Sequence, residues 1–281
     1  MRRIGANGVQ LSCDTGRSVE TRSGITVSDQ PENSMAERIW AYALQGDRTD
    51  LDDAELLWTG DGPFRISRIQ NPLGEEYMAL FADKFNGLSS AIEVENIAST
   101  VLHRINGLLF LRDIHRAPLR SAGILERLTD GTYARHAVVK GAVLVGRIRI
   151  HGTGVVGDSY AAKSPHPVEQ AWLAQAMADN TLSDVLIFLQ DAPGWFDLWK
   201  AFEMMRDDVQ IRSNRLPWHK TDVAWPSQTA MDRFEQTANH YRHSRAKRIP
   251  VPKSGWMEIE EGRRWVSRLV VAWLEWRQRN R

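Results

Sequence analysis

Hydrophobic residues recur at three- and four-residue steps between positions 94 and 109, and this spacing predicts an amphipathic helix. The repeat is carried by Val94, Ile97, Ala98, Val101, Leu102, Ile105 and Leu109. Asn106 and Gly107 interrupt the pattern near its end. Because glycine costs about 1 kcal/mol in a helix interior, we expect the last turn to be distorted or the helix to end there.

Shorter alternating patterns on both sides of this helix predict β-strands. Residues 37–44 and 75–81 are two such segments. Residues 54–59 and 64–69 flank the turn sequence Gly60-Asp61-Gly62-Pro63, which predicts a hairpin. A second hairpin is predicted for residues 121–128 and 132–139, which Thr129-Asp130-Gly131 joins, and residues 143–150 alternate less cleanly.

After residue 165 the pattern is helical. Apolar positions predict helices at residues 168–179, 182–189, 194–208, 228–246 and 257–278. Pro217 and Pro226 bracket an irregular loop, and Pro250 and Pro252 break the chain again before the last helix. The sequence therefore predicts an α+β protein, with an N-terminal mixed antiparallel β-sheet and one amphipathic helix followed by a C-terminal α-helical bundle.

Composition divides the chain further. Residues 1–34 are rich in Gly, Ser, Thr and Asp without a regular period, which predicts a disordered leader. We then expect an α+β domain at residues 35–151, a linker at 152–164 and a helical domain at 165–281.

Bulk composition excludes few classes of function. The single cysteine, Cys13, excludes an intramolecular disulfide and a cysteine-only zinc site, and it suits a cytoplasmic protein. No apolar run approaches the roughly 18 residues that span a bilayer, so we expect no membrane partner. Nine of the eleven tryptophans follow residue 171, which indicates an aromatic helical core; the alternative is base stacking by Trp218, Trp225 and Trp256 in loop-like segments.

Positive charge is concentrated at the C-terminal end. Residues 233–281 contain twelve Lys or Arg against five Glu, although the whole chain has a net charge of only +1. Such a region can attract a phosphate-bearing partner such as RNA. The alternative is that the acids and bases stabilise opposite ends of the last helix through its dipole.

The main candidate site lies in the predicted helix at residues 228–246. Arg233 and His240 are seven residues apart and therefore share one helix face. Phosphodiester cleavage needs an acid or base and a cation near the developing charge. His240 or His243 is the candidate acid/base, Arg233 or Arg242 the candidate phosphate clamp, and Asn239 a supporting residue.

Other site types have weaker support. Gly152-Thr-Gly154-Val-Val-Gly157 matches a dinucleotide-binding spacing, but no amphipathic helix opens directly after it. His240 and His243 have no third metal ligand nearby, and zinc-protease and serine-hydrolase motifs are absent from the sequence. We therefore expect neither a cofactor nor a metal.

The C-terminal half resembles the HEPN-like (higher eukaryotes and prokaryotes nucleotide-binding) superfamily, in which an Arg and a His are separated by four to six residues. Arg233 and His240 have six residues between them, with Phe234 where the superfamily usually has a polar residue. The resemblance implies a small helical bundle, often a homodimer, and a metal-independent ribonuclease in a toxin or defence context.

The chain from Met35 onward also resembles a group of uncharacterised bacterial proteins. The matching residues are Thr237-Ala238-Asn239, Arg242-His243, Pro250, Pro252, Trp273-Leu274, Ile105-Asn106-Gly107, and Trp195, Leu198, Trp199, Lys200 and Glu203.

Two functional hypotheses follow. The first is an RNA-directed HEPN-like ribonuclease with Arg233 and His240 at its centre. The second is a non-catalytic binding or scaffolding protein, in which Asn239, Arg242 and His243 hydrogen-bond to buried carbonyls and hold the loop that contains Pro250 and Pro252.

Overall fold

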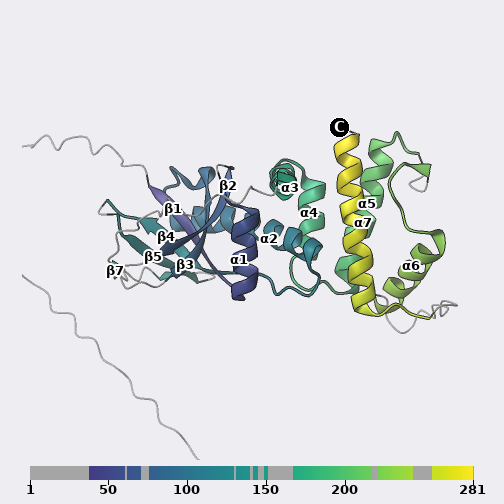
Figure 1. Ribbon diagram of the computed structural model, residues 1–281, viewed down its shortest axis with the longest axis horizontal. Coiled ribbons are helices and arrows are strands. Elements are labelled where there is room, and N and C mark those ends of the chain that lie inside the picture. The colour runs from purple at the N-terminus through teal and green to yellow at the C-terminus, as the bar shows by residue number, and fades with distance from the viewer. Residues whose placement is uncertain are drawn as a thin grey trace, which may run out of the picture. The chain divides into compact units, whose positions relative to one another are not determined.

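The computed structural model describes residues 38–60, 62–70, 76–129, 131–139, 142–144, 149–150, 167–216, 220–242 and 255–280. They form the predicted α+β fold, with the strands in the first half and most helices in the second (Figure 1). The described residues all belong to one compact unit. The predicted leader at residues 1–34 and linker at 152–164 lie outside the described residues.

The sheet is antiparallel and is centred on β1 (Ile39–Gln45), which pairs with β3 (Glu76–Ala82) on one side and β4 (Arg120–Arg127) on the other. β2 (Phe64–Gln70) continues the sheet beyond β3. β5 (Tyr133–Val139) pairs with β4 through the predicted hairpin, and it also pairs with the short strands β6 (Ala142–Leu144) and β7 (Arg149–Ile150).

The two faces of β1 enter different clusters. Trp40, Tyr42 and Leu44 belong to the large core that the helices share. Ala41 and Ala43 belong to a small cluster on the opposite face, with Ile69, Ala79 and Leu125. Alternation therefore directs the large side chains of β1 towards the helices.

The first predicted hairpin is wrong in its first arm. Residues 54–59 do not form a strand, because α1 (Arg48–Leu57) occupies most of that segment. Asp47 caps the helix by accepting a hydrogen bond from the Thr49 amide at 2.9 Å. Leu51, Ala54 and Leu57 then follow a helical spacing, with Ala54 and Leu57 buried. The cap and this spacing outweigh the local turn signal at Gly60.

The amphipathic helix is α2 (Ala91–Arg112), which begins with a capping box made by Ser90 and Glu93. It continues through Gly107, so the expected break does not occur. A Cβ atom at Gly107 would lie 2.4 Å from the Leu186 carbonyl oxygen, which shows how closely α4 approaches at this point. Gly107 thus permits helix packing, which outweighs its poor helix propensity.

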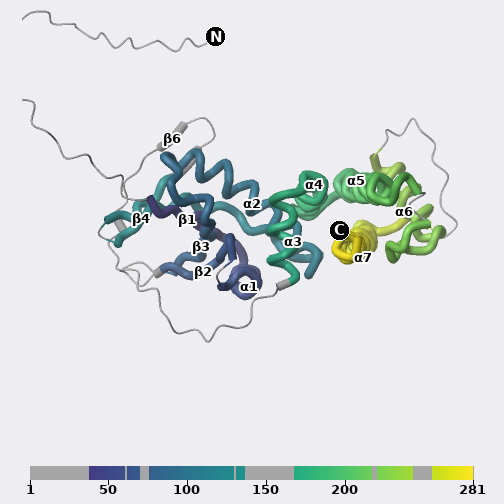
Figure 2. The backbone as a smooth tube through the Cα atoms, turned by 90° about the horizontal axis from the view of Figure 1, so that it is seen from above, coloured from purple at the N-terminus to yellow at the C-terminus, as the bar shows by residue number. Residues whose placement is uncertain are grey.

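The second half contains α3 (Pro167–Ala178), α4 (Asn180–Leu189), α5 (Trp195–Arg212), α6 (Gln228–Arg242) and α7 (Ile259–Arg279). α2 packs against α3, α4 and α7, while α5 packs against α4, α6 and α7 (Figure 2). The predicted helix at residues 228–246 corresponds to α6, and residues 243–250 lie outside the described part. No helix in the described ranges is long and apolar enough to cross a membrane.

The predicted aromatic core is present between α5, α6 and α7. Phe234 of α6 stacks on Trp265 of α7 with their ring centroids 4.3 Å apart, and it meets Phe202 of α5 edge-on at 5.4 Å. Trp199 stacks against the same Phe234 ring. Such contacts add roughly 0.5–1.5 kcal/mol per pair beyond the burial of apolar area.

A buried ion network ties α7 to α4 and α5. The Arg277 side chain is only 2% exposed, and it donates a hydrogen bond to Asp179 and lies 3.8 Å from Asp208. Arg212 also pairs with both carboxylates, at 3.0 and 2.8 Å. Trp273 Nε1 donates to Asp208 at 3.0 Å. Asp179 additionally caps α4 by accepting from the Leu182 amide at 2.9 Å.

We expect this network to make the fold sensitive to acid. Burial alone would raise the pKa of Asp179, but the Leu182 amide and the two arginines together hold it below its usual value. A carboxylate whose pKa is lower in the folded than in the unfolded state stabilises the fold. This contribution is fully present above the unfolded pKa of about 3.9, and it is lost as the pH falls through the folded pKa. The Asp179→Asn variant should therefore be less stable than wild type in urea at pH 6, and the difference should shrink at pH 3. An equal difference at both pH values would contradict this.

Candidate functional site

The structure places the candidate residues Arg233, Asn239, His240 and Arg242 on α6, whereas His243, Pro250 and Pro252 lie outside the described residues. Arg233 and His240 do share a helix face, because both contact Trp256 in the segment before α7. Arg233 Nη2 donates to the Trp256 carbonyl at 3.0 Å, and the His240 ring stacks on the Trp256 ring with centroids 4.4 Å apart.

The Arg233 guanidinium is committed to protein groups. Its Nε donates to the Gly255 carbonyl at 3.0 Å, Nη2 binds the Trp256 carbonyl, and Nη1 forms an ion pair with Glu261. The side chain is partly buried. These bonds fix the start of α7 against α6.

Thr237 makes a second link between the same two segments. It is fully buried, and its hydroxyl donates to the Arg233 carbonyl at 2.7 Å while accepting from the Met257 amide at 3.1 Å. The sequence places Thr237 on the Arg233 face, but it does not reveal this bridge, because Met257 lies twenty residues further along the chain.

Asn239 and Arg242 lie on the side of α6 that faces α5. Arg242 Nη2 donates to Asn239 Oδ1 at 2.7 Å, and its guanidinium lies over the Trp199 ring, 4.4 Å from the centroid. Nearby, the Lys200 ammonium, followed by Arg206 and Arg242, lowers the pKa of Glu203. Both candidate residues thus have structural partners.

His240 belongs to a row of four rings that reaches the surface at its middle two members, and we call it the aromatic row. Its members are Trp195, Tyr241, His240 and Trp256. Tyr241 stacks on Trp195 nearly parallel at 5.7 Å, and it meets His240 edge-on at 5.0 Å. His240 then stacks on Trp256. Tyr241 is 57% exposed, and the His240 side chain is also exposed.

Tyr241 is not among the residues expected from the sequence, although a signal for it exists. Met231, Phe234 and Ala238 form the buried stripe of α6, and Tyr241 continues that stripe at the next three-residue step. The first three residues are buried whereas Tyr241 is not. An apolar stripe that extends onto the surface is typical of a contact face.

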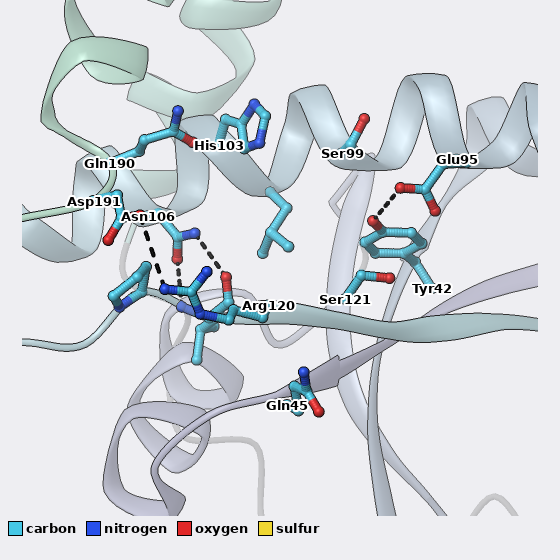
Figure 3. A pocket seen from close by; sticks show the side chains of 13 residues that line it. Tyr42, Gln45, Glu95, Ser99, His103, Asn106, Arg120, Ser121, Gln190 and Asp191 are labelled. Atoms are coloured by element: carbon cyan, nitrogen blue, oxygen red, sulfur yellow. Dashed lines mark hydrogen bonds and ion pairs between the residues drawn. The ribbon is translucent and has the colours of Figure 1, made fainter. Parts of the chain in front are cut away.

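A separate pocket of about 410 Å³ lies between β1, α2, the start of β4 and the loop after α4 (Figure 3). Its polar lining residues are Tyr42, Gln45, Glu95, Ser99, His103, Asn106, Arg120, Ser121, Gln190 and Asp191. Asn106 supports one end, because its amide accepts from the Leu119 N–H and donates to the Leu119 carbonyl, both at 2.9 Å. The sequence pattern does not predict this pocket.

Tyr42 and Glu95 form a pair in this pocket. The Tyr42 side chain is 1% exposed, and its hydroxyl donates to Glu95 Oε1 at 3.0 Å. Burial is the main reason that the pKa of Tyr42 is strongly raised, so the phenol remains protonated and stays a donor. Burial also lowers the pKa of His103, with a further contribution from Arg104.

Neither a metal site nor a similarity to known proteins identifies a function for this chain. Within the described ranges, no group of three or more His, Cys, Asp or Glu side chains is placed to hold a metal ion. No family model, curated protein or solved structure matches the chain. The resemblance to the HEPN-like superfamily therefore stays a prediction.

Proposed function

We propose that this protein binds single-stranded RNA without cleaving it, and that the Arg233 motif is structural. The single observation that carries the proposal is the aromatic row, in which stacked rings reach the surface at Tyr241 and His240. Bases stack on such rings with little dependence on sequence, and each stacked base contributes roughly 1–3 kcal/mol.

Charge near the row supports a nucleic-acid partner. Residues 242–257 contain Arg242, Arg245, Lys247, Arg248 and Lys253, and no Asp or Glu. This stretch directly follows Tyr241 and includes Trp256, so positive charge and stacking rings are adjacent in the sequence. In single-stranded RNA, the phosphates can contact the positive charges and the bases can stack on the rings.

The bonding of Arg233 favours binding over catalysis. A phosphate clamp must offer N–H donors to the charge that develops in the transition state. In Arg233 the Nε, Nη1 and Nη2 atoms already have protein partners. Releasing these three donors would detach Gly255 and Trp256 from α6. The Trp256 ring, on which His240 stacks, would be detached as well.

Binding to a labelled single-stranded oligouridylate, followed by fluorescence anisotropy, tests the proposal. Tyr241→Ala should weaken binding by about tenfold, because one stacking platform is lost. Ile211→Ala is the matched control. Ile211 is also exposed, at 75%, but it lies near the C-terminal end of α5, whereas Trp195 begins this helix. Equal affinity of wild type and Tyr241→Ala would contradict the proposal.

The same samples, analysed by gel electrophoresis, test the ribonuclease alternative. We expect the RNA to remain intact with wild type and with His240→Ala alike. Cleavage by wild type that His240→Ala abolishes would favour the HEPN-like nuclease instead. The resemblance also implies a homodimer, which stays a prediction. Light scattering of the purified protein tests it.

A further inference from the structure

The pocket between β1, α2 and β4 contains a carboxylate without a cationic partner among the described residues. Glu95 accepts a hydrogen bond from Tyr42, and no Lys or Arg in the described ranges pairs with it. The nearby Arg104 points elsewhere, since its Nε donates to Ser183 Oγ at 3.0 Å and its Nη1 lies 3.1 Å from the Met177 sulfur.

The other charges of the pocket compensate one another. Arg120 and Asp191 lie 3.8 Å apart at the opposite end from Glu95 (Figure 3). His103 forms no ion pair in the described part of the chain; burial and the nearby Arg104 lower its pKa, and the charge of Glu95 offsets this only in part. Among the described residues, Glu95 is therefore the carboxylate of this pocket that has no Lys or Arg partner.

The Tyr42–Glu95 pair is preorganised to receive a cation. Tyr42 is held by the sheet, because β1 pairs with β3 at Leu80 and with β4 at Ile124. Its hydroxyl fixes one oxygen of Glu95, which restricts the rotamers of that carboxylate before a ligand arrives. The side-chain amides of Gln45 and Gln190 supply neutral donors and acceptors elsewhere in the lining.

We propose that this pocket binds a small organic cation with a primary ammonium group, which forms a charge-assisted hydrogen bond to Glu95. A neutral polar tail on the same ligand would contact Gln45, His103 or Gln190. The volume of about 410 Å³ is within the range of small-molecule sites. This site is independent of the aromatic row on α6, so either proposal can fail without the other.

Three probes of equal chain length separate the possible ligand charges. Titration calorimetry with the full chain should detect binding of 4-amino-1-butanol, and neither neutral 1,4-butanediol nor anionic 4-hydroxybutyrate should match its affinity. Glu95→Gln should weaken binding of the amine by about tenfold or more, since a hydrogen bond to a charged group is replaced by a neutral one. Tyr42→Phe should weaken it less, because the ring remains and only the orienting hydroxyl is lost.

Glu275→Gln is the control, because it removes the same charge from an exposed position on α7. It should bind the amine as wild type does. The proposal is overturned if wild type binds none of the three probes, if 4-hydroxybutyrate binds more tightly than the amine, or if Glu95→Gln and wild type have equal affinity. Circular dichroism of each variant verifies that the fold is retained.

Discussion

Replacing Asn106 by Ala should lower the free energy of unfolding by about 2–5 kcal/mol, because two buried backbone groups lose their partner at once. The Leu119 amide and carbonyl both bond to this side chain, and Leu119 is buried. An unsatisfied buried donor or acceptor costs about 1–3 kcal/mol. Urea unfolding followed by circular dichroism measures the effect.

Asn96→Ala is the matched control for this prediction. Asn96 lies on the same helix, α2, but is exposed. We expect a change of no more than about 0.5 kcal/mol there, as is usual for surface substitutions. If the two variants unfold at the same urea concentration, the Asn106–Leu119 contact does not contribute as described.

Replacing Arg277 by Ala should have a comparable effect, of about 3 kcal/mol. The guanidinium is almost completely buried and compensates Asp179 and Asp208. Removing one partner of a buried ion pair typically costs about 3–5 kcal/mol, because the other charge is left without compensation. Arg212 also contacts both carboxylates, so we expect the lower end of that range.

Two variants separate charge from packing at this position. Arg277→Met retains much of the side-chain volume against Trp273, over whose ring the guanidinium lies at 4.8 Å. It should be nearly as destabilising as Arg277→Ala if charge compensation dominates. Arg268→Ala removes an exposed arginine from the same helix and should change stability little. Near-wild-type stability of Arg277→Met would show that packing, and not charge, accounts for the loss.

Local patterns in the sequence were sufficient to predict most elements of the fold. The three- and four-residue spacing from Val94 to Leu109 predicts α2, and Thr129-Asp130-Gly131 predicts the β4–β5 hairpin. These signals are local and strong. The strand that the turn signal predicts at residues 54–59 is wrong, because the decisive residue, the cap Asp47, lies seven residues earlier.

Contacts between distant residues were not predictable in the same way. Gly107 has a poor helix propensity, yet it permits α4 to approach α2 at Leu186, 79 positions later. The sequence predicts that Arg277 stabilises a helix C-terminus, and the acids Glu260 and Glu261 do lie in the first turn of the same helix, α7. Its burial depends on Asp179 and Asp208, which no local spacing reveals.

The candidate site illustrates the same limit. The spacing of Arg233 and His240 correctly places both side chains on one face, but their shared neighbour, Trp256, comes from the segment before α7. With that neighbour present, Arg233 holds the chain and His240 becomes part of a stacked surface. This geometry supports the proposed binding through rings over chemistry through an acid–base pair.

Ultraviolet crosslinking of the wild-type protein to single-stranded oligouridylate, followed by mass spectrometry of the crosslinked peptides, tests this account most directly. We expect crosslinks at Tyr241, His240 or Trp256, and intact RNA in the sample before irradiation. Crosslinks confined to residues outside the aromatic row, or RNA already cut by the protein, would contradict the account.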